Sequence, residues 1–322
     1  METKKIKLSV LVTFYNQEDY VDRAFDSIFR QKVSFPFEVL VGDDGSSDGT
    51  IDKVKEWQKR FPDIIRIYIQ PRENRKYLSG ERASGNRLSL LEHINGEYFM
   101  YLDGDDCYCD DYKFQKQVDI LDANPDCSCC SHNVSFVHLD GSSTVLKTWF
   151  NKSGKISFPY YWWKGYFHPD SLMFRSENIH QNIDYRHRLF FNDNFITYVF
   201  AHMGKIYFLT DVMACYYETD NGIWNGQSKI VGWIRTVTIY EYLWNIYRKN
   251  RVVNYLRAVP LYYLILKNSN ELSTEKIQSY IQIGKENNAS LISSLSDGKA
   301  IKSKKAFYRV LYSINALAKR VF

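Results

Sequence analysis

The feature that most constrains this fold is a repeat of an apolar strand followed by an amphipathic helix within the first 120 residues. Apolar runs that are typical of buried strands cover residues 6–14, 37–42, 64–70 and 97–102. Apolar residues at helical spacing follow each of the first three runs. Because parallel strands need long crossover connections, this order predicts an α/β fold with a mostly parallel, helix-covered sheet, Rossmann-like in its first half. The loop at 13–16 lacks the glycines of a dinucleotide fingerprint, which argues against a nicotinamide-dependent dehydrogenase.

The fourth apolar run ends abruptly at three carboxylates, Asp103, Asp105 and Asp106. Asp43 and Asp44 end the second run in the same way. Ligands of open α/β sheets bind beyond the carboxyl ends of the strands, so these acids are expected to face a crevice. Carboxylates there suit Mg²⁺ or Mn²⁺ bridged to a substrate diphosphate. The alternative interpretation is a polar turn, because Asp and Gly are common in turns for local reasons.

Three stretches carry a family resemblance. They are SVLVTFYN at 9–16, EVLVGDDGSSDGT at 38–50 and GEYFMYLDGDD at 96–106. Their order and spacing resemble the successive signatures of family 2 glycosyltransferases, which have the GT-A fold, over about residues 5–225. The resemblance implies an inverting, metal-dependent transfer of a sugar from a nucleoside diphosphate sugar, with UDP as the expected nucleotide. It also implies a glycan or lipid-linked acceptor in bacterial surface polysaccharide synthesis.

The same resemblance implies roles for residues that would bind the donor. Thr13 and Tyr15 match positions that line the nucleotide pocket, with the Tyr ring against the base. Asp44 matches the residue that accepts a hydrogen bond from the uracil N–H, and Asp43 supports it. Arg82 is in register with a basic residue that meets the nucleotide.

The predicted cofactor is Mn²⁺ or Mg²⁺. Asp105 matches the direct metal ligand of the Asp-x-Asp motif, and Asp103 matches its partner nearer the ribose. A metal on the diphosphate offsets the charge that grows as the nucleoside diphosphate leaves. The segment 213–224 is similar to the family's closing Tyr-Arg-x-His segment, but it has Tyr217 for the Arg and no His. Trp224 is then a candidate to cover the donor instead.

Asp193 is the predicted catalytic base. It lies in the stretch 190–196, which resembles the family's Glu-Asp motif, although Asn192 replaces the Glu. A base that takes the acceptor hydroxyl's proton is typically worth ~10²–10⁴ in rate. The alternative is that Asp193 is a helix N-cap.

An aromatic segment at 158–169 includes Trp162 and Trp163, which together with Trp224 are candidates for the acceptor site. Sugar rings present apolar C–H faces that stack on such side chains, although a plain core cluster is an equally good interpretation. His168 and His202 are given no role, because lone histidines are more often structural.

Charge divides the chain. Residues 229–322 hold 16 Lys+Arg against 5 Asp+Glu, whereas residues 1–228 are net acidic. This division predicts a boundary near residue 228, with a basic region over 229–322 that the spacing of its apolar residues predicts to be helical. The family resemblance implies that 1–228 is the catalytic domain, with a nucleotide-sugar half at 1–120 and an acceptor half at 121–228. The last segment, 299–322, has the pattern of an amphipathic helix that contacts an anionic membrane surface, or else of a helix that packs on protein.

The six cysteines form no C-x-x-C pair, and no secretory signal precedes them. We expect reduced thiols and a cytoplasmic protein, peripheral on the inner face of the plasma membrane if the tail binds lipid. The spacing is wrong for a zinc site built from the cysteines at 107, 109, 127 and 129. Nucleic acid is not an expected partner, since the basic residues gather in the tail. Two alternatives remain: a sugar-1-phosphate nucleotidyltransferase, which would need a Gly-rich loop at 13–16, and a non-catalytic nucleotide or glycan binder.

Overall fold

A computed structural model describes most of the chain. The described residues are 5–74, 77, 80–146, 150–157, 167–177, 179, 191–219, 229–246, 251–268, 275–286, 290–296, 308 and 312. Contacts divide the chain into two units, Met1–Thr219 and Asp220–Phe322. The predicted acceptor residues Trp162, Trp163 and Trp224 lie outside the described residues, as does most of 299–322.

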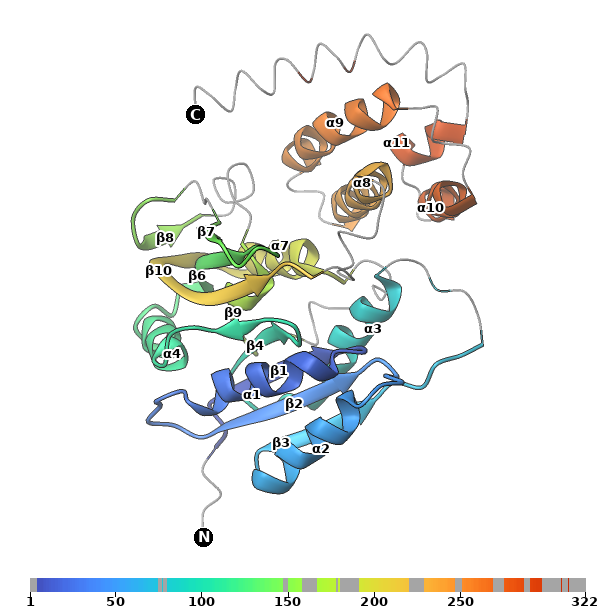
Figure 1. The fold of residues 1–322 in the computed structure, drawn as a ribbon. Coiled ribbons are helices and arrows are strands. Elements are labelled where there is room, and N and C mark those ends of the chain that lie inside the picture. The colour runs from blue at the N-terminus through green and yellow to red at the C-terminus, as the bar shows by residue number, and fades with distance from the viewer. Residues whose placement is uncertain are drawn as a thin grey trace. The chain divides into compact units, whose positions relative to one another are not determined.

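The first unit is built on a mixed sheet (Figure 1). Its described strands are β1 (Leu8–Phe14), β2 (Phe37–Asp43), β3 (Ile65–Ile69), β4 (Tyr98–Asp103), β5 (Cys107–Tyr108), β6 (Cys127–Val137), β7 (Ser143–Val145), β8 (Gly154–Ile156), β9 (Met173–Arg175) and β10 (Lys205–Tyr217). The order across the sheet is β3-β2-β1-β4-β9-β6-β10-β5. In addition, β7 pairs with β6, and β8 pairs with β10. The first four strands are parallel, and the antiparallel β9 joins them to the parallel pair β6 and β10.

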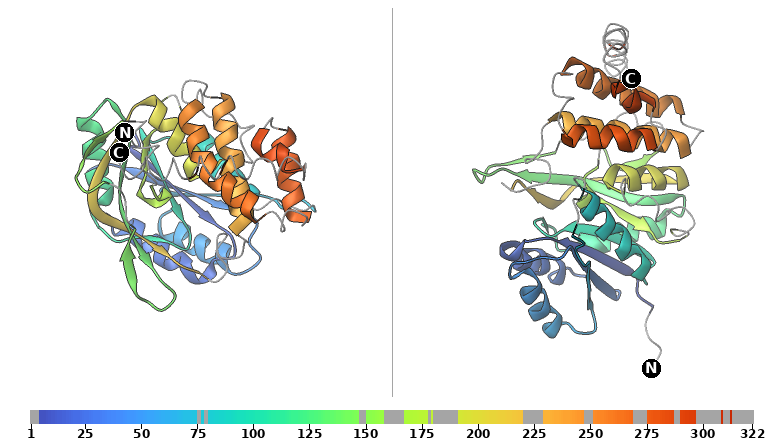
Figure 2. Two further views of the ribbon diagram at one scale, coloured as in Figure 1. Left: turned by 90° about the horizontal axis from the view of Figure 1, so that it is seen from above. Right: turned by 90° about the vertical axis from the view of Figure 1, so that its right-hand side faces the viewer.

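Helices cover both faces of the parallel half because its strands are apolar on both sides. The helices of this unit are α1 (Val21–Phe29), α2 (Thr50–Arg60), α3 (Glu81–Leu90), α4 (Lys113–Ala123) and α7 (Asp193–Met203). Val10 and Val12 of β1 share one core with α1, α2 and α4, in which the rings of Phe25 and Trp57 stack at 5.3 Å. Figure 2 shows α1 and α2 side by side in two further directions. On the opposite face α3 contacts β1 and β2.

The predicted α/β class is confirmed, the four early strands lie within one or two residues of the expected bounds, and a helix follows each of the first three. The second half differs more. Its long strand β10 runs over Lys205–Tyr217, with register irregularities between Leu209 and Ala214. The sequence reasoning did not anticipate β9 or α4.

The second unit is helical in its described parts, as expected. Its elements are α8 (Lys229–Ile246), α9 (Arg251–Lys267), α10 (Glu275–Glu286), α11 (Ser290–Ser293) and a 3₁₀ turn at Ser294–Ser296. The buried carboxylate of Glu241 accepts hydrogen bonds from the backbone N–H groups of Leu291 (2.7 Å) and Ile292 (3.1 Å), which satisfies the start of α11. The ring of Tyr308 packs edge-on against Tyr262 of α9 at 4.8 Å. A search of the described helices finds none with the length and apolar character needed to span a bilayer.

Candidate active site

The parallel register aligns the ends of three strands. Thr13 of β1 is paired with Asp103 of β4, and Phe14 is paired with Asp43 of β2. The Thr13 hydroxyl donates a hydrogen bond to Oδ1 of Asp103 at 3.2 Å. Thr13, Asp43 and Asp103 therefore lie in one row at the carboxyl edge of the sheet.

Asp103 is held from several sides. The guanidinium of Arg87, from α3, donates hydrogen bonds to both carboxylate oxygens of Asp103. The backbone N–H of Asp103 donates to Oδ1 of Asp170 at 3.2 Å. Burial lowers the pKa of Arg87. The charges of Asp103, Asp193 and Asp170 raise it by more than burial lowers it, so the net shift of the pKa is upward. The sequence reasoning missed Arg87, because its spacing of five residues from Arg82 places the two side chains on different faces of α3.

The turn after β4 is tight. The N–H of Gly104 donates to the carbonyl of Thr13 at 2.9 Å, and the N–H of Asp106 donates to the carbonyl of Asp103 at 2.9 Å. A Cβ on Gly104 would lie 2.1 Å from Cδ1 of Phe14, so this position accepts only glycine without a shift of the ring. Asp105 is half-buried, and burial, with the neighbouring charge of Asp103, raises the pKa of its carboxyl to about 6.

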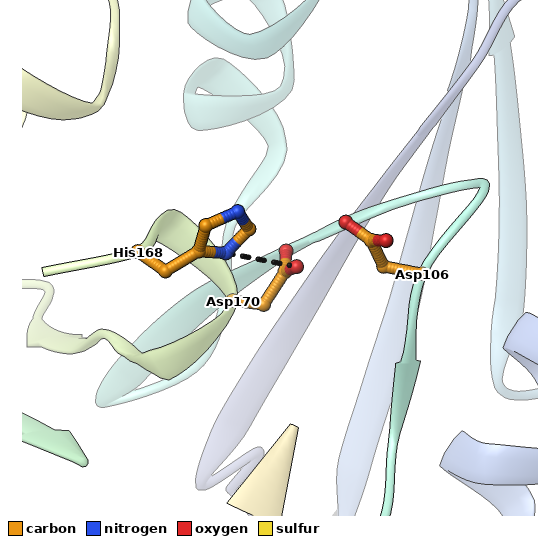
Figure 3. Close-up of side chains that lie close together, drawn as sticks. All are labelled: Asp106, His168 and Asp170. Carbon is orange, nitrogen blue, oxygen red and sulfur yellow. Dashed lines mark ion pairs between the residues drawn. The ribbon is translucent and has the colours of Figure 1, made fainter. Parts of the chain in front are cut away.

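Behind this turn lies a mostly buried group of Asp106, His168 and Asp170 (Figure 3), in which both aspartates are fully buried and the histidine is partly buried. One ligand atom from each lies within 4.8 Å of the others. His168 Nδ1 is 3.2 Å from Oδ2 of Asp170. Oδ1 of Asp106 accepts from the N–H of Tyr217 at 2.8 Å, whereas its Oδ2 has no hydrogen-bond donor among the described residues.

Burial raises the pKa of Asp106 well above its ordinary value, and the charge of Asp170 adds to this. Burial also opposes charge on His168, but the adjacent Asp170 outweighs it and raises the pKa of the imidazole. The His168–Asp170 ion pair is thus favoured, and Asp106 is the member that resists ionisation. The sequence reasoning assigned no role to His168 and did not consider Asp170.

The predicted nucleotide side contains a second ion pair. Arg82 Nη2 lies 2.7 Å from Oδ1 of Asp44, and the same side chain donates to the carbonyls of Pro71 and Gln70. Burial raises the pKa of Asp44, and the charge of Arg82 offsets part of that rise. The two residues form an ion pair, and each holds the other in place.

Tyr15 presents an exposed ring at this end of the sheet, with 42% of its surface accessible. The guanidinium of Arg72 stacks on that ring at 3.9 Å and also donates to the backbone carbonyl of Asp44. Asp43 is fully buried, and its Oδ2 accepts from the N–H groups of Gly45 and Ser46 at 2.9 Å each. Asp43 therefore shapes the loop that carries Asp44.

Asp193 begins α7 but is not its cap. The N-cap is Asn192, whose side-chain oxygen accepts from the N–H of Phe195 at 2.9 Å. Asp193 is half-buried and lines a small pocket with Arg87 and Tyr101. The pocket connects the proposed base to the Arg87 side chain that holds Asp103, so both carboxylates belong to one region of the first unit.

The sequence is similar to those of known proteins. A family model described as glycosyl transferase family 2 matches residues 9–183. The chain belongs to this family. It is 29% identical over 227 residues to an uncharacterized protein of Mycobacterium tuberculosis, which covers 68% of this chain and 60% of that protein. It is 33% identical over 122 residues to the putative teichuronic acid biosynthesis glycosyltransferase TuaG of Bacillus subtilis, covering 38% of this chain and 44% of TuaG. The chain thus spans less than two thirds of the length of these relatives.

Solved structures agree on the fold. The S. aureus TarS 1-349 structure in complex with UDP-GlcNAc has a TM-score of 0.67 at 14% identity, covering 96% of this chain and 89% of that one. The mannosyltransferase PcManGT from Pyrobaculum calidifontis, in complex with GDP-Man and Mn²⁺, has a TM-score of 0.53 at 17% identity, covering 99% and 88%. This member of family 2 has the GT-A fold, as the three sequence signatures predicted.

Proposed function

We propose that this chain is an inverting glycosyltransferase that moves one sugar from a nucleoside diphosphate sugar, with UDP as the expected nucleotide, to a glycan or lipid-linked acceptor. The observation that supports this most is the row of Thr13, Asp103 and Asp105 where β1 and β4 end, in a chain of glycosyl transferase family 2. Ligands of α/β sheets bind at this edge.

The proposed acceptor class follows the relatives. TuaG is named for teichuronic acid biosynthesis, and a Campylobacter jejuni relative, 35% identical over 100 residues, is named as a glucosyltransferase acting on an undecaprenol-linked glycan. A surface polysaccharide made at the cytoplasmic face of the plasma membrane fits both names. The predicted contacts of Trp162, Trp163 and Trp224 with the acceptor remain part of this proposal.

Donor recognition would use the exposed ring of Tyr15 for the base and the carboxylate of Asp44 for the uracil N–H. Arg82 occupies Oδ1 of Asp44, whereas Oδ2 is 3.8 Å from Arg72 Nη2, too far for a hydrogen bond. Oδ2 is thus able to accept from a base. Thr13 would contact the nucleotide beside Asp103.

The donor set fits a divalent cation. Asp105, the proposed direct ligand of Mn²⁺ or Mg²⁺, offers carboxylate oxygens, which these hard ions prefer. The pKa of Asp105 is raised to about 6 by burial and by Asp103, and a nearby cation favours the charged form of such a group. When bound, the metal would offset the charge on the leaving diphosphate. Asp106 and Asp170 are fully buried behind the turn, so we assign them to holding it.

Asp193 is the proposed general base. Its carboxylate would take the proton of the acceptor hydroxyl as that oxygen attacks the anomeric carbon from the face opposite the diphosphate. Arg87 lies near Asp193, and the charge of Asp193 contributes to the raised pKa of Arg87. Asn192 supplies the cap of α7, and Asp193 lines the pocket together with Arg87.

The test is a panel of nucleotide sugars with Mn²⁺, with release of nucleoside diphosphate as the readout, first without acceptor and then with lipid-linked glycans. We expect release from one nucleotide sugar, lost on chelation and in Asp105→Ala. Asp63→Ala, an exposed position after α2, is the matched control. Binding without release would identify a non-catalytic binder. Pyrophosphate release from a nucleoside triphosphate and a sugar-1-phosphate would identify a nucleotidyltransferase.

A further inference from the structure

Three of the six cysteines meet at one edge of the sheet of the first unit. Cys107 of β5 is the direct antiparallel partner of Cys215 of β10. The N–H of Cys109 donates to the carbonyl of Met213 at 3.1 Å, which continues the same ladder. Side chains two residues apart in a strand share a face, so the Cys107, Cys109 and Cys215 thiols point to one side. On that face Cys215 lies directly opposite Cys107 and diagonally opposite Cys109.

The three thiols differ in access. Cys109 is exposed, Cys215 is half-buried, and Cys107 is buried at 8% exposure. The neighbouring Cys215 thiol lowers the pKa of Cys109, whereas burial limits access to Cys107. The thiolate is the reactive form, so Cys109 combines access with reactivity.

The distance between the Cα atoms decides which two of these cysteines can form a stable disulfide. Directly paired residues of an antiparallel ladder have Cα atoms about 4.5–5.5 Å apart, inside the range of disulfides. Cys109 and Cys215 are diagonal neighbours, for which the separation is about 7–8 Å, outside that range. The pair Cys107 and Cys215 therefore suits a lasting disulfide, and Cys109 does not.

We propose that Cys107, Cys109 and Cys215 form an oxidation site, at which a peroxide reacts with Cys109 and the resulting disulfide settles between Cys107 and Cys215. The Cys109 thiolate attacks the peroxide, the O–O bond breaks, and a sulfenic acid forms. Cys215 attacks the sulfenic sulfur and releases water. Cys107 then attacks the Cys215 sulfur and expels Cys109 as a thiolate, which is a good leaving group when its pKa is low. In total, two thiols and hydrogen peroxide give one disulfide and two waters.

This site lies beyond the proposed function and needs no donor or acceptor to be tested. The full chain is treated with hydrogen peroxide, its free thiols are blocked, and its peptides are mapped without reduction. We expect a linked pair of Cys107 and Cys215 with Cys109 free, reversed by dithiothreitol. Cys109→Ser should slow formation of the disulfide between Cys107 and Cys215 at least about tenfold, because the thiol that reacts first with the peroxide is absent.

Two further variants sharpen the result. In Cys107→Ser the reaction should stop at Cys109, as a sulfenic acid that dimedone traps or as a strained bond to Cys215. Cys129→Ala, at a fully buried position in β6, should oxidise at the wild-type rate. The proposal is overturned if Cys215 stays unlinked in the wild-type chain, or if Cys109→Ser links Cys107 to Cys215 as fast as the wild type does.

Discussion

Arg87 of α3 binds both carboxylate oxygens of Asp103 at the end of β4. A planar guanidinium that meets a carboxylate at two points fixes the rotation of that carboxylate as well as its charge. Arg87 also lines the pocket of Asp193. One side chain thus connects the proposed donor site to the proposed base, and its removal should disturb both.

Arg87→Lys is expected to keep the fold and lose activity. An ammonium group cannot make the planar two-point contact, so Asp103 would lose its fixed orientation. Replacing a residue that orients a site residue in this way typically lowers activity or metal affinity ~10–100-fold. Donor turnover and circular dichroism measured together check this. Arg60→Lys, an exposed position on α2, is the matched control, and wild-type turnover in Arg87→Lys would contradict the positioning role.

Neighbouring substitutions at the start of α7 should separate stability from chemistry. Asn192→Ala removes the cap that bonds the Phe195 N–H, so the free energy of unfolding should fall by about 1 kcal/mol while turnover of the folded protein persists. Asp193→Asn should leave the melting temperature near that of the wild type, keep donor binding by calorimetry and lower turnover by ~10²–10⁴. If Asp193→Asn turns over normally, Asp193 is not the base.

The sequence predicts the parallel half well because its signals are local and repeated. Apolar runs of strand length alternate with helical spacing, and parallel strands bring their carboxyl ends to one edge. The alignment of Thr13 with Asp103 follows from that rule and is seen in the register. The row of acids was accordingly predictable before any coordinates.

The buried group and the thiol site were not predictable, because they depend on contacts between distant segments. Asp170 lies in a 3₁₀ turn before β9, a strand of three residues that is too short to show a period. Cys215 meets Cys107 only because β10 continues beyond its irregular register with β6 and there pairs with β5. Arg87 is flanked by uncharged residues in α3, and only its contact with the distant Asp103 shows its role.

Lys113 gives a prediction on stability and pH. Its ammonium is fully buried over the ring of Tyr108 and donates to Oε1 of Gln117 at 2.6 Å, and burial lowers its pKa to about 7. Between about pH 7 and 10 the unfolded chain binds a proton here that the folded chain does not. The free energy of unfolding should therefore rise with pH across this window, by at most about 1.4 kcal/mol per pH unit.

Lys113→Met should remove that slope. The variant should gain most over the wild type near pH 7, and the gain should shrink as the pH approaches 10, whatever constant cost comes from losing the bond to Gln117. Urea unfolding at several pH values measures it. Lys55→Met, an exposed position on α2, should follow the wild type. Equal slopes in Lys113→Met and the wild type would show that Lys113 is charged in the folded chain at neutral pH.

The basic segment 299–322 has two competing roles that one variant can separate. It holds seven Lys/Arg and no acid, which suits an anionic membrane surface, while Tyr308 is buried against Tyr262 within the second unit. Each basic residue near such a surface contributes about 1 kcal/mol to the free energy of membrane binding. Changing Lys302, Lys304 and Lys305 to Gln should therefore lower the affinity for anionic vesicles about a hundredfold.

Flotation with vesicles of anionic phospholipid measures this, and neutral vesicles give the baseline. A triple change to Gln at exposed basic positions of α2 is the matched control: Lys55, Lys59 and Arg60. It should float like the wild type, because only a basic cluster on the contacting surface contributes. If the tail variant also floats like the wild type, the segment acts by packing on α9, and the lysines serve only its solubility.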